Sequence, residues 1–480
     1  MTQTFICTSE NGNSYIYDTK SKLSILVHPE MKKAIENTSD PDSYYMRKYK
    51  YLKKYGFFTE TNIVNWGLVT ESMIKNNMPE IPQIVFETTD FCNLSCTYCA
   101  LGDVYEGFDA RNQKKIDIDK AIVFLKYIFS IKSKSSKNQL YISFFGGEPL
   151  VNGAFIKQIV EIAEQLNSNK NLELIYTITT NATLLHKYID FLAKNKFQLL
   201  ISLDGNEKNH SYRSFRNNQK NSFKKVISNV DMLQKAYPEY FKQYVNFNAV
   251  LHDRNSVKDI YEFIYPRYHK VPRISELNPC DINPHKIDLF NQMFKDKFEN
   301  EAEYAKEESN FLPHEERIQY KELTEFIKNN SVNCYISDIN ELFAKEKTYL
   351  PTGTCLPFWK KLMLTTNNKL ALCEKVNYHK LTVGEVDETV KIDIHKIVQQ
   401  YNFYYKNVQK LCLKCYANKS CSVCLFLMRD RNLEKLNEGN FVCEDFCDEK
   451  RFGRKLNRVL SFLEKFPKDN FSIIENIVIS

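Results

Sequence analysis

The chain has 480 residues, enough for two to four domains, and its 43% hydrophobic and 26% charged residues are typical of a soluble globular protein. A run of about 18 apolar residues, as a transmembrane helix needs, is absent, and the first residues, MTQTFICTSENG, do not resemble a secretory signal. We therefore expect a cytoplasmic protein with no membrane partner. Fourteen cysteines in such a protein indicate metal or cluster ligands in place of disulfides.

Residues 1–80 form the first expected domain. Three short strands, TFICT, SYIYDT and LSILVH, come before helical segments near residues 29–37, 44–55 and 69–77. This order predicts a small winged-helix-like module.

Residues 81–280 alternate strand and helix patterns six times. The strands are almost continuously apolar, as strands buried on both faces of a parallel sheet must be. The pattern predicts an α/β fold, a partial (β/α)6 TIM-type barrel, in which chemistry occurs at the carboxyl ends of the strands. The expected strands are 81–89, 139–147, 172–180, 197–205, 244–252 and 272–277, and the expected helices are 118–129, 154–166, 184–194, 222–234 and 257–268.

The remaining residues divide into three expected parts. Residues 281–350 are polar and rich in charge, which favours a helical, solvated bridge. Residues 351–450 hold eight of the fourteen cysteines, and residues 451–480 should form a terminal helix with a short apolar tail.

Three cysteines, Cys92, Cys96 and Cys99, follow the first barrel strand in the segment TTDFCNLSCTYCALG. Two thiols would suggest a redox dithiol and four a closed structural metal site. Three thiols suit a cubane iron–sulfur cluster with one open iron. A zinc site is the alternative, but no histidine lies nearby in the sequence to act as its fourth ligand.

Glycine or polar residues end the next three strands. Paired glycines after the second strand allow the backbone to approach a ligand closely. Because carboxyl ends of parallel strands meet at one edge, these residues predict a ring of ligand contacts, with turns and solvated loops as the alternative. They are Gly146, Gly147, Glu148, Thr179, Asn181, Ser202 and Asp204, followed by Arg213 and Arg216.

Together these features resemble the radical SAM superfamily, in the superfamily's own order, over about residues 84–278. The loop that contains Cys92, Cys96, Tyr98 and Cys99 is similar to its C-x3-C-x-aromatic-C signature. The resemblance implies one [4Fe-4S] cluster on the three cysteines, with S-adenosyl-L-methionine chelated to the open iron. It further implies cofactor binding by Tyr98 and the strand-end residues, with Gly146, Gly147 and Glu148 on the methionine amine and Ser202 on the ribose.

The arginine for the cofactor carboxylate departs from the usual pattern. Relatives place it four residues after a histidine, but Ser214 stands four residues after His210. Arg213 is one position early and Arg216 two positions late, and we favour Arg213.

The C-terminal cysteines resemble the SPASM extension of radical SAM proteins, with one residue deleted before Cys424 and Asn368 where glycine is usual. Asn tolerates positive φ, so the turn at Asn368 should survive. The resemblance implies two auxiliary [4Fe-4S] clusters, while a zinc ribbon is the alternative. The distal cluster would use Cys412, Cys415, Cys421 and Cys443, and the nearer one Cys355, Cys373 and Cys424, with Cys447, Cys334 or an open position as its fourth ligand.

Glu374 directly follows Cys373. By resemblance to anaerobic sulfatase-maturating enzymes it is a candidate catalytic proton acceptor, and a solvated surface position is the alternative. Cys7 and Cys280 are expected to be small buried side chains. Three cubanes on eleven thiolates would lower the formal charge of +7 to about +2, so we expect no nucleic-acid partner.

The resemblance implies an enzyme that cleaves S-adenosylmethionine to a 5′-deoxyadenosyl radical and removes hydrogen from an unactivated C–H bond. Because residues 1–80 resemble a leader-recognition element, we predict maturation of a ribosomally made precursor peptide by a thioether or carbon–carbon crosslink. Expected partners are that peptide with its leader and an electron donor such as flavodoxin or ferredoxin. A sulfatase-type formylglycine maturase is the alternative enzyme, and a zinc-stapled interaction protein is the non-enzyme alternative.

Leader recognition would use the third strand, LSILVH, as an open sheet edge beside the helix YYMRKYKYLKKYG. The lysines of that helix and Arg47 suit an acidic leader. A structural cap on the barrel is the alternative role for residues 1–80.

Overall fold

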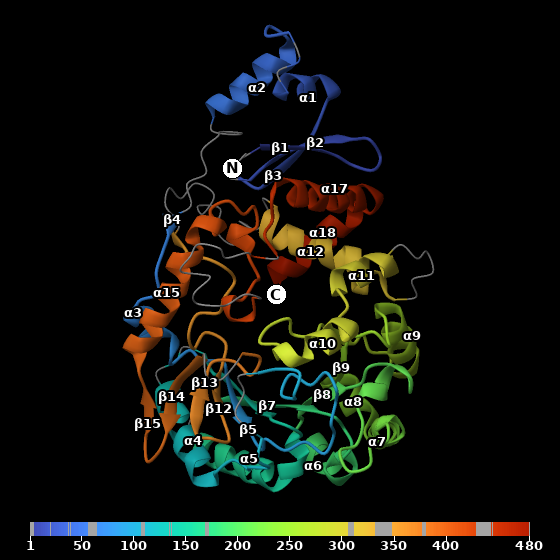
Figure 1. Cartoon of the computed structure of the whole chain (residues 1–480). Coiled ribbons are helices and arrows are strands. Elements are labelled where there is room, and N and C mark those ends of the chain that lie inside the picture. Colours follow the sequence, from blue (N-terminus) through green and yellow to red (C-terminus); the bar gives the residue numbers. More distant parts are fainter. Residues whose placement is uncertain are drawn as a thin grey trace.

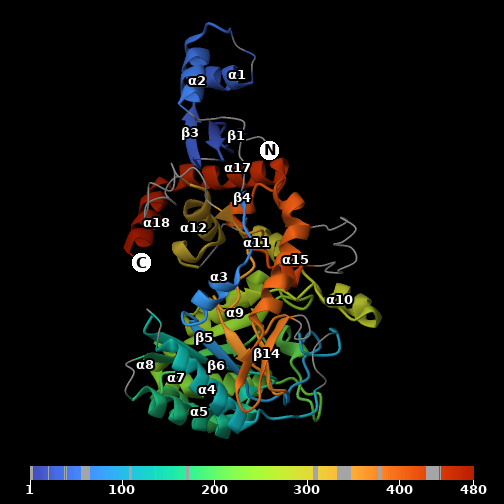
Figure 2. The same cartoon turned by 90° about the vertical axis from the view of Figure 1, so that its left-hand side faces the viewer.

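The computed structural model of the chain places a large sheet with its helices at one end and a small sheet at the other, with a layer of helices between them (Figures 1 and 2). It describes residues 4–19, 21–36, 38, 40–55, 65–106, 111–133, 135, 137–168, 172–305, 312–331, 348–376, 381–428, 443 and 445–479. Among these residues, none of the helices is long and apolar enough to cross a membrane.

Six parallel strands form the predicted partial barrel, and its helices lie on one face of the sheet (Figure 1). Along β7 the residues Tyr176 and Ile178 are buried toward those helices, while Thr177 and Thr179 on the opposite face are half-buried. The open face therefore carries the polar side chains. The strands are β5 (Gln83–Glu87), β6 (Gln139–Phe145), β7 (Glu173–Thr180), β8 (Gln198–Ser202), β9 (Val245–Val250) and β10 (Arg273–Ser275).

The predicted barrel helices are confirmed, and one short helix was not predicted. Asp117 caps the first of them by accepting hydrogen bonds from the amides of Asp119 and Lys120. The helices are α4 (Ile118–Lys132), α5 (Gly153–Asn167), α6 (Ile189–Lys194), α7 (Phe223–Ala236), α9 (Val257–Tyr268) and the additional α8 (Pro238–Tyr244).

The cysteine-rich part of the chain extends the barrel sheet. Strand β12 (Leu362–Leu364) pairs parallel to β5, and β13 (Lys369–Ala371), β14 (Thr382–Val386) and β15 (Val390–Ile392) continue antiparallel from it. Asn368 has φ +60° in the turn between β12 and β13, as its place in the sequence predicted.

The N-terminal sheet has strands β1 (Thr4–Thr8), β2 (Ser14–Asp18) and β3 (Leu23–Val27), with β3 at one edge. Helices α1 (Pro29–Ile35) and α2 (Tyr44–Lys54) cover one face of this sheet, around Ile16 and Val27. Figures 1 and 2 show the sheet standing on α17 (Glu449–Lys465), distant from the barrel helices. The module is thus not a cap on the barrel.

The third helix expected in this module packs elsewhere. Helix α3 (Glu71–Asn77) lies against α15 (Ile394–Cys412), and Val69 exchanges two backbone-to-side-chain hydrogen bonds of 2.8 Å with Asn402. Ile74 of this helix and Val69 just before it belong to the barrel core, which explains why α3 packs away from the N-terminal sheet.

The expectation of a solvated bridge at residues 281–350 is wrong for one of its helices. Of α10 (Ile287–Met293), α11 (Lys297–Ala305) and α12 (Ile318–Asn330), the last buries Leu323, Phe326 and Ile327 against α17 and α18 (Pro467–Ile479). The polar composition concealed a short apolar stripe at helical spacing. This second core also contains Phe5 and Tyr17 of the N-terminal sheet, so it joins the two ends of the chain.

Phe452 lies at the centre of this second core. Its ring is 5.0 Å from that of Phe5, 5.5 Å from Tyr17 and 5.7 Å from Tyr416. Phe452→Ala should lower the free energy of unfolding by about 3–5 kcal/mol, because it leaves a cavity between the N-terminal sheet and α17. Thermal denaturation measures the loss, and Phe471→Ala, at a residue 68% exposed, is the matched control with little effect. Equal stability of the two variants would contradict this packing.

Candidate active site and cysteine groups

The loop of Cys92, Cys96 and Cys99 follows β5 and pairs with the segment that follows β8. The amide of Ser95 donates to the carbonyl of Ser214 (2.9 Å), and the amide of Arg216 donates to the carbonyl of Asn93 (2.9 Å). The bridge between Leu94 and Phe215 is antiparallel. In the same register, Cys96 stands directly opposite Arg213, so their side chains leave the same face of the ribbon.

The three thiols lie close together, because, in addition to burial, the charge of Cys99 raises the pKa of both Cys92 and Cys96. Burial raises the pKa of Cys92 to about 12, and the charges of Glu148 and Cys99 add to this. Thiolates at such a site need a bound cation for stability, which suits a cationic cluster. Among the described residues, no three His, Cys, Asp or Glu side chains converge on a single metal ion. A cubane needs no such point, because each cysteine binds a separate iron.

The glycine pair after β6 is required by the approach of two backbones. A Cβ on Gly147 would lie 2.1 Å from the carbonyl oxygen of Phe91, and one on Gly146 would lie 2.2 Å from that of Thr89. The amides of Gly147 and Glu148 donate to these same two carbonyls at 2.9 Å. The glycines therefore allow the segment after β6 to approach and hold the cysteine loop.

Glu148 is buried beneath the loop. Its carboxylate accepts hydrogen bonds from the Thr180 hydroxyl and the Asn181 amide, both at 2.7 Å. Burial raises the pKa of Glu148 to about 7, although these hydrogen bonds oppose the shift. The side chain of Asn181 extends beside Cys92, with its Nδ2 at 3.8 Å from the sulfur.

Half-buried polar residues line the open face of the sheet. Thr179 and Ser202 lie there as predicted, at the ends of β7 and β8. The sequence reasoning missed Asn248 and Ser275, whose side chains share a 2.9 Å hydrogen bond across β9 and β10. Both could have been found in the sequence, because each is a polar residue that alternates with apolar ones in its strand, at a position whose side chain points to the open face.

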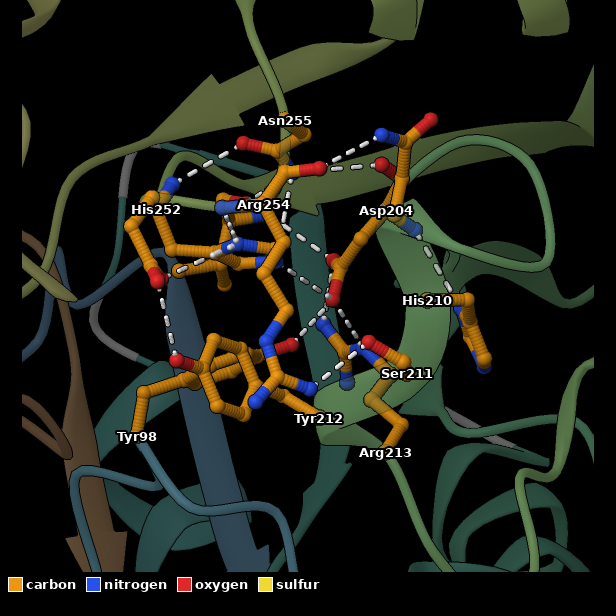
Figure 3. A network of polar contacts seen from close by, with 12 residues as sticks. Tyr98, Asp204, His210, Ser211, Tyr212, Arg213, His252, Arg254 and Asn255 are labelled. Atoms are coloured by element: carbon orange, nitrogen blue, oxygen red, sulfur yellow. Dashed lines mark hydrogen bonds and ion pairs between the residues drawn. The ribbon is translucent and has the colours of Figure 1, made fainter.

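Figure 3 shows the network around Asp204. Arg213 donates two hydrogen bonds of 2.9 Å to the Asp204 carboxylate, and the Tyr98 hydroxyl donates a third. The Val250 amide donates to the same carboxylate at 3.0 Å, and the ring of Tyr98 stacks on His252 at 5.4 Å. Tyr98, Asp204 and Arg213 are thus brought together, with the guanidinium of Arg213 engaged by Asp204.

Arg216 occupies a different environment. Its side chain is exposed, and its Nε donates to the carbonyl of Cys92 at 3.0 Å. It therefore lies next to the cysteine loop without an acidic partner among the described residues. We expect Arg216, in addition to Arg213, to be a candidate for the cofactor carboxylate.

The C-terminal cysteines lie in two groups. Cys355, Cys373 and Cys424 all influence the protonation of Tyr401, whose hydroxyl donates to the carbonyl of Cys355 at 3.3 Å. Tyr401 belongs to α15 and is fully enclosed beside this nearer group.

The distal group contains Cys412, Cys415, Cys421 and Cys443, because, in addition to burial, the charges of the other three raise the pKa of Cys412. Cys447 lies with this group, because its amide donates to the Cys415 sulfur at 3.4 Å. The position of Cys447 therefore does not favour it as a ligand of the nearer group, while Cys334 lies outside the described residues. The distal cysteines line a cavity of about 1200 Å³ between β10, α12 and α17.

Glu374 makes an ion pair with Lys361, whose Nζ is 2.9 and 3.0 Å from its two carboxylate oxygens. The two side chains are only 17% and 20% exposed, beside Cys373. Glu374 is therefore not on a solvated surface, and its catalytic role stays a prediction.

Two scattered cysteines are buried, as expected. Cys7 belongs to the core beneath the N-terminal sheet. The thiol of Cys280 donates to the carbonyl of Leu427 at 2.6 Å, three residues after Cys424. Since Asp281 also accepts a 2.8 Å hydrogen bond from the amide of Glu106, this segment links the first cysteine loop to the nearer group.

A partial parallel barrel with three thiols and polar side chains at its strand ends has the arrangement that an enzyme with an open iron–sulfur cluster needs. Residues 86–264 match the profile of the Radical SAM superfamily. The chain is 23% identical, over 79% of its length and 98% of the relative, to a cysteine-type anaerobic sulfatase-maturating enzyme of Clostridium perfringens. It is 26% identical, over 36% of each chain, to the radical SAM cyclopropyl synthase TigE of Paramaledivibacter caminithermalis.

A further relative is the cysteine-type anaerobic sulfatase-maturating enzyme of Clostridium novyi, at 25% identity, where the alignment spans 59% of the relative. Among solved structures, native anSMEcpe with bound AdoMet superposes with a TM-score of 0.54 at 19% identity, over 82% of this chain and 99% of that one. This likeness shows the fold. The chain carries a radical SAM domain, and enzymes with this domain use a [4Fe-4S] cluster and S-adenosylmethionine.

The glycine contacts give a first test of this site. Gly147→Ala places a methyl group against the backbone of Phe91, so the cysteine loop must move. Iron bound to purified protein should fall, and unfolding should become easier by about 1–3 kcal/mol. Gly453→Ala is the matched control, because nothing lies within 4 Å of its new methyl group in α17, and it should stabilise the helix by about 0.5–1 kcal/mol. A Gly147→Ala protein with full iron content would refute the close approach.

The three cysteines give a second test. Changing Cys92, Cys96 and Cys99 together to Ala should remove about four irons per chain and stop release of 5′-deoxyadenosine. Cys7→Ala, which alters a buried cysteine of the N-terminal sheet, should leave the iron content unchanged. Continued 5′-deoxyadenosine release by the triple variant would exclude these cysteines as the cluster ligands.

Proposed function

We propose that the chain is a radical SAM/SPASM maturase that installs a thioether or carbon–carbon crosslink in a ribosomally made precursor peptide. The observation that carries this proposal is the free edge of the N-terminal sheet. Among the described residues, β3 pairs with β2 and with no second strand, and its Leu26 is 60% exposed. An extended leader can add to such an edge as a fourth strand, with main-chain hydrogen bonds giving affinity.

Helix α2 supplies a surface with suitable chemistry beside this edge. It packs on the sheet through Tyr45, Tyr49 and Leu52, near Ile25 and Val27 of β3. Its outer side exposes Tyr44 and Tyr51, and Tyr55 follows the helix, each about 60% exposed, together with the four exposed cations Arg47, Lys48, Lys50 and Lys54. Within the described residues these cations make no ion pair, which supports an acidic peptide as the partner.

The two C-terminal cysteine groups support auxiliary clusters of the SPASM kind. When bound, the first cluster and S-adenosylmethionine supply a 5′-deoxyadenosyl radical that removes hydrogen from a peptide C–H bond. The chain's part is to orient the cofactor on the glycine pair and strand-end residues and to hold the proton acceptor. Glu374 would accept the proton that crosslinking releases, with Lys361 fixing its carboxylate.

The relatives support a peptide as the substrate class. One superposed structure is native anSMEcpe with bound AdoMet and a Kp18Cys peptide, at a TM-score of 0.53. An electron donor such as flavodoxin or ferredoxin would reduce the clusters of this chain.

A sulfatase-type formylglycine maturase is the second candidate. It is favoured by the alignment with the Clostridium perfringens enzyme, which spans 98% of that relative. The N-terminal sheet argues for the first candidate, because the match covers 79% of this chain and leaves a fifth of it for another task.

Co-expression separates the two candidates. The chain should be produced anaerobically with each short open reading frame beside its gene, and separately with a sulfatase peptide that contains the cysteine to be oxidised. Mass spectrometry should show the loss of two hydrogen atoms per crosslink in one encoded peptide. Formylglycine in the sulfatase peptide, with no encoded peptide changed, would establish the second candidate instead.

Leader recognition is best tested by surface changes, because deleting residues 1–80 would also remove Phe5 and Tyr17 from the second core. Leu26→Asp combined with Arg47→Glu should reduce peptide modification at least tenfold, since both changes oppose an acidic strand at this edge. The control Lys224→Glu reverses a charge on the barrel, at a side chain 84% exposed, and should leave modification unchanged.

The two variants must first match in iron content and melting temperature. If the double variant then modifies full-length peptide at the normal rate, the edge of β3 has no role in recognition.

A further inference from the structure

The buried pair of Asp204 and Arg213 joins the cysteine loop to the ends of β8 and β9. Their side chains are 0% and 9% exposed, with two hydrogen bonds of 2.9 Å between them. The guanidinium carbon of Arg213 lies 5.4 Å from the centre of the Tyr98 ring. Tyr98 itself lies between Cys96 and Cys99 in the sequence. Figure 3 shows Tyr98, Asp204 and Arg213 converging on one another.

The backbone register places the positive charge next to one cysteine. Hydrogen bonds join Ser95 to Ser214 at 2.9 Å and Thr97 to Tyr212 at 3.4 Å, so Cys96 and Arg213 are directly opposed. Asp204, at the end of β8, accepts two hydrogen bonds of 2.9 Å from Arg213. The pair therefore presents its positive end to the cysteine loop.

Both members of the pair are ionised. Burial opposes the charged form of Asp204, but the Arg213 guanidinium outweighs burial and holds the pKa of Asp204 well below its usual value. Burial likewise opposes the charge of Arg213, and Asp204 outweighs it, so the pKa of Arg213 is raised. Two fixed charges thus remain in a site shielded from water.

We propose that Asp204 and Arg213 are positioning residues that set the reduction potential of the cluster expected on Cys92, Cys96 and Cys99. A reduced cluster carries one more negative charge, so a fixed cation beside a ligand sulfur favours reduction and a fixed anion opposes it. The negative charge of Asp204 partly offsets the rise in reduction potential caused by Arg213. Its bidentate contact also holds the guanidinium group in place. This inference rests on the radical SAM domain and is independent of the proposed peptide substrate.

Because Asp204 and Arg213 carry opposite charges, removing each charge should shift the reduction potential of the cluster in opposite directions. Asp204→Asn leaves the guanidinium uncompensated and should raise the ratio of reduced to oxidised cluster about tenfold at a fixed potential, a shift of ~59 mV for one electron. Arg213→Gln removes the cation and should lower that ratio by a similar factor. Arg213→Lys keeps the charge and should stay near the wild-type value, although it loses the bidentate geometry.

The measurement is a redox titration of the full-length protein with all its clusters, followed by electron paramagnetic resonance. The radical SAM cluster is distinguished from the others because its signal changes when S-adenosylmethionine is added. Asp231 and Arg267 provide the matched control, since they form a similar pair at 2.5 Å on the outside of the barrel, with side chains 42% and 43% exposed. Asp231→Asn and Arg267→Gln should leave the potential unchanged.

The proposal is tested by the signs of the shifts in reduction potential of the two single variants. Shifts of the same sign for Asp204→Asn and Arg213→Gln, or no shift in either with iron retained, would overturn it. If single changes reduce stability, the double variant Asp204→Asn/Arg213→Gln removes both charges and should give a potential between those of the two singles. Loss of this cluster's iron in every variant, Arg213→Lys included, would assign the pair a purely structural role and also overturn the proposal.

Discussion

The cysteine loop after β5 has little regular structure, so its shape depends on the backbones that hold it from two sides. The segment after β6 approaches so closely that its amides at Gly147 and Glu148 bond the carbonyls of Thr89 and Phe91. The segment after β8 pairs with the cysteine loop through the hydrogen bond from the amide of Ser95 to the carbonyl of Ser214. Both neighbours are strand ends of one parallel sheet, so the positions of the three thiols follow from the packing of that sheet.

The sequence was sufficient for the strands and for the identity of the groups at their ends. Short apolar runs separated by helical patterns indicated buried strands, and all six predicted barrel strands are present. Contacts between side chains far apart in the sequence could not be predicted as well, because charge and spacing do not specify which strand ends meet. Arg213 illustrates the limit, since the sequence offered it as a cofactor ligand and the structure supplies Asp204 as its partner. The same reason explains why Cys447 was not placed with Cys415 and why α3 was assigned to the wrong module.

The second core has consequences for the N-terminal sheet. The ring of Phe5 in β1 is 4.7 Å from Tyr416, the neighbour of Cys415 in the chain. The sheet is therefore held on its inner face by the segment that carries the distal cysteines, while α2 packs on the opposite face and, among the described residues, β3 pairs with β2 alone. A peptide bound at β3 would lie on the same structural unit as the distal group, so the proposed leader binding and the integrity of that group would depend on one core.

The direction of the strands separates the first cysteine loop from the nearer group. β12 runs parallel to β5, and β13 runs back, so Cys373 follows β13 at the edge where β5 begins. Cys92 follows β5 at the other edge, and a strand of five residues spans roughly 17 Å. A substrate held against the open face of the sheet would lie between these two groups. Hydrogen removal at one end and electron uptake at the other would then act on the same bound substrate without either group having to move.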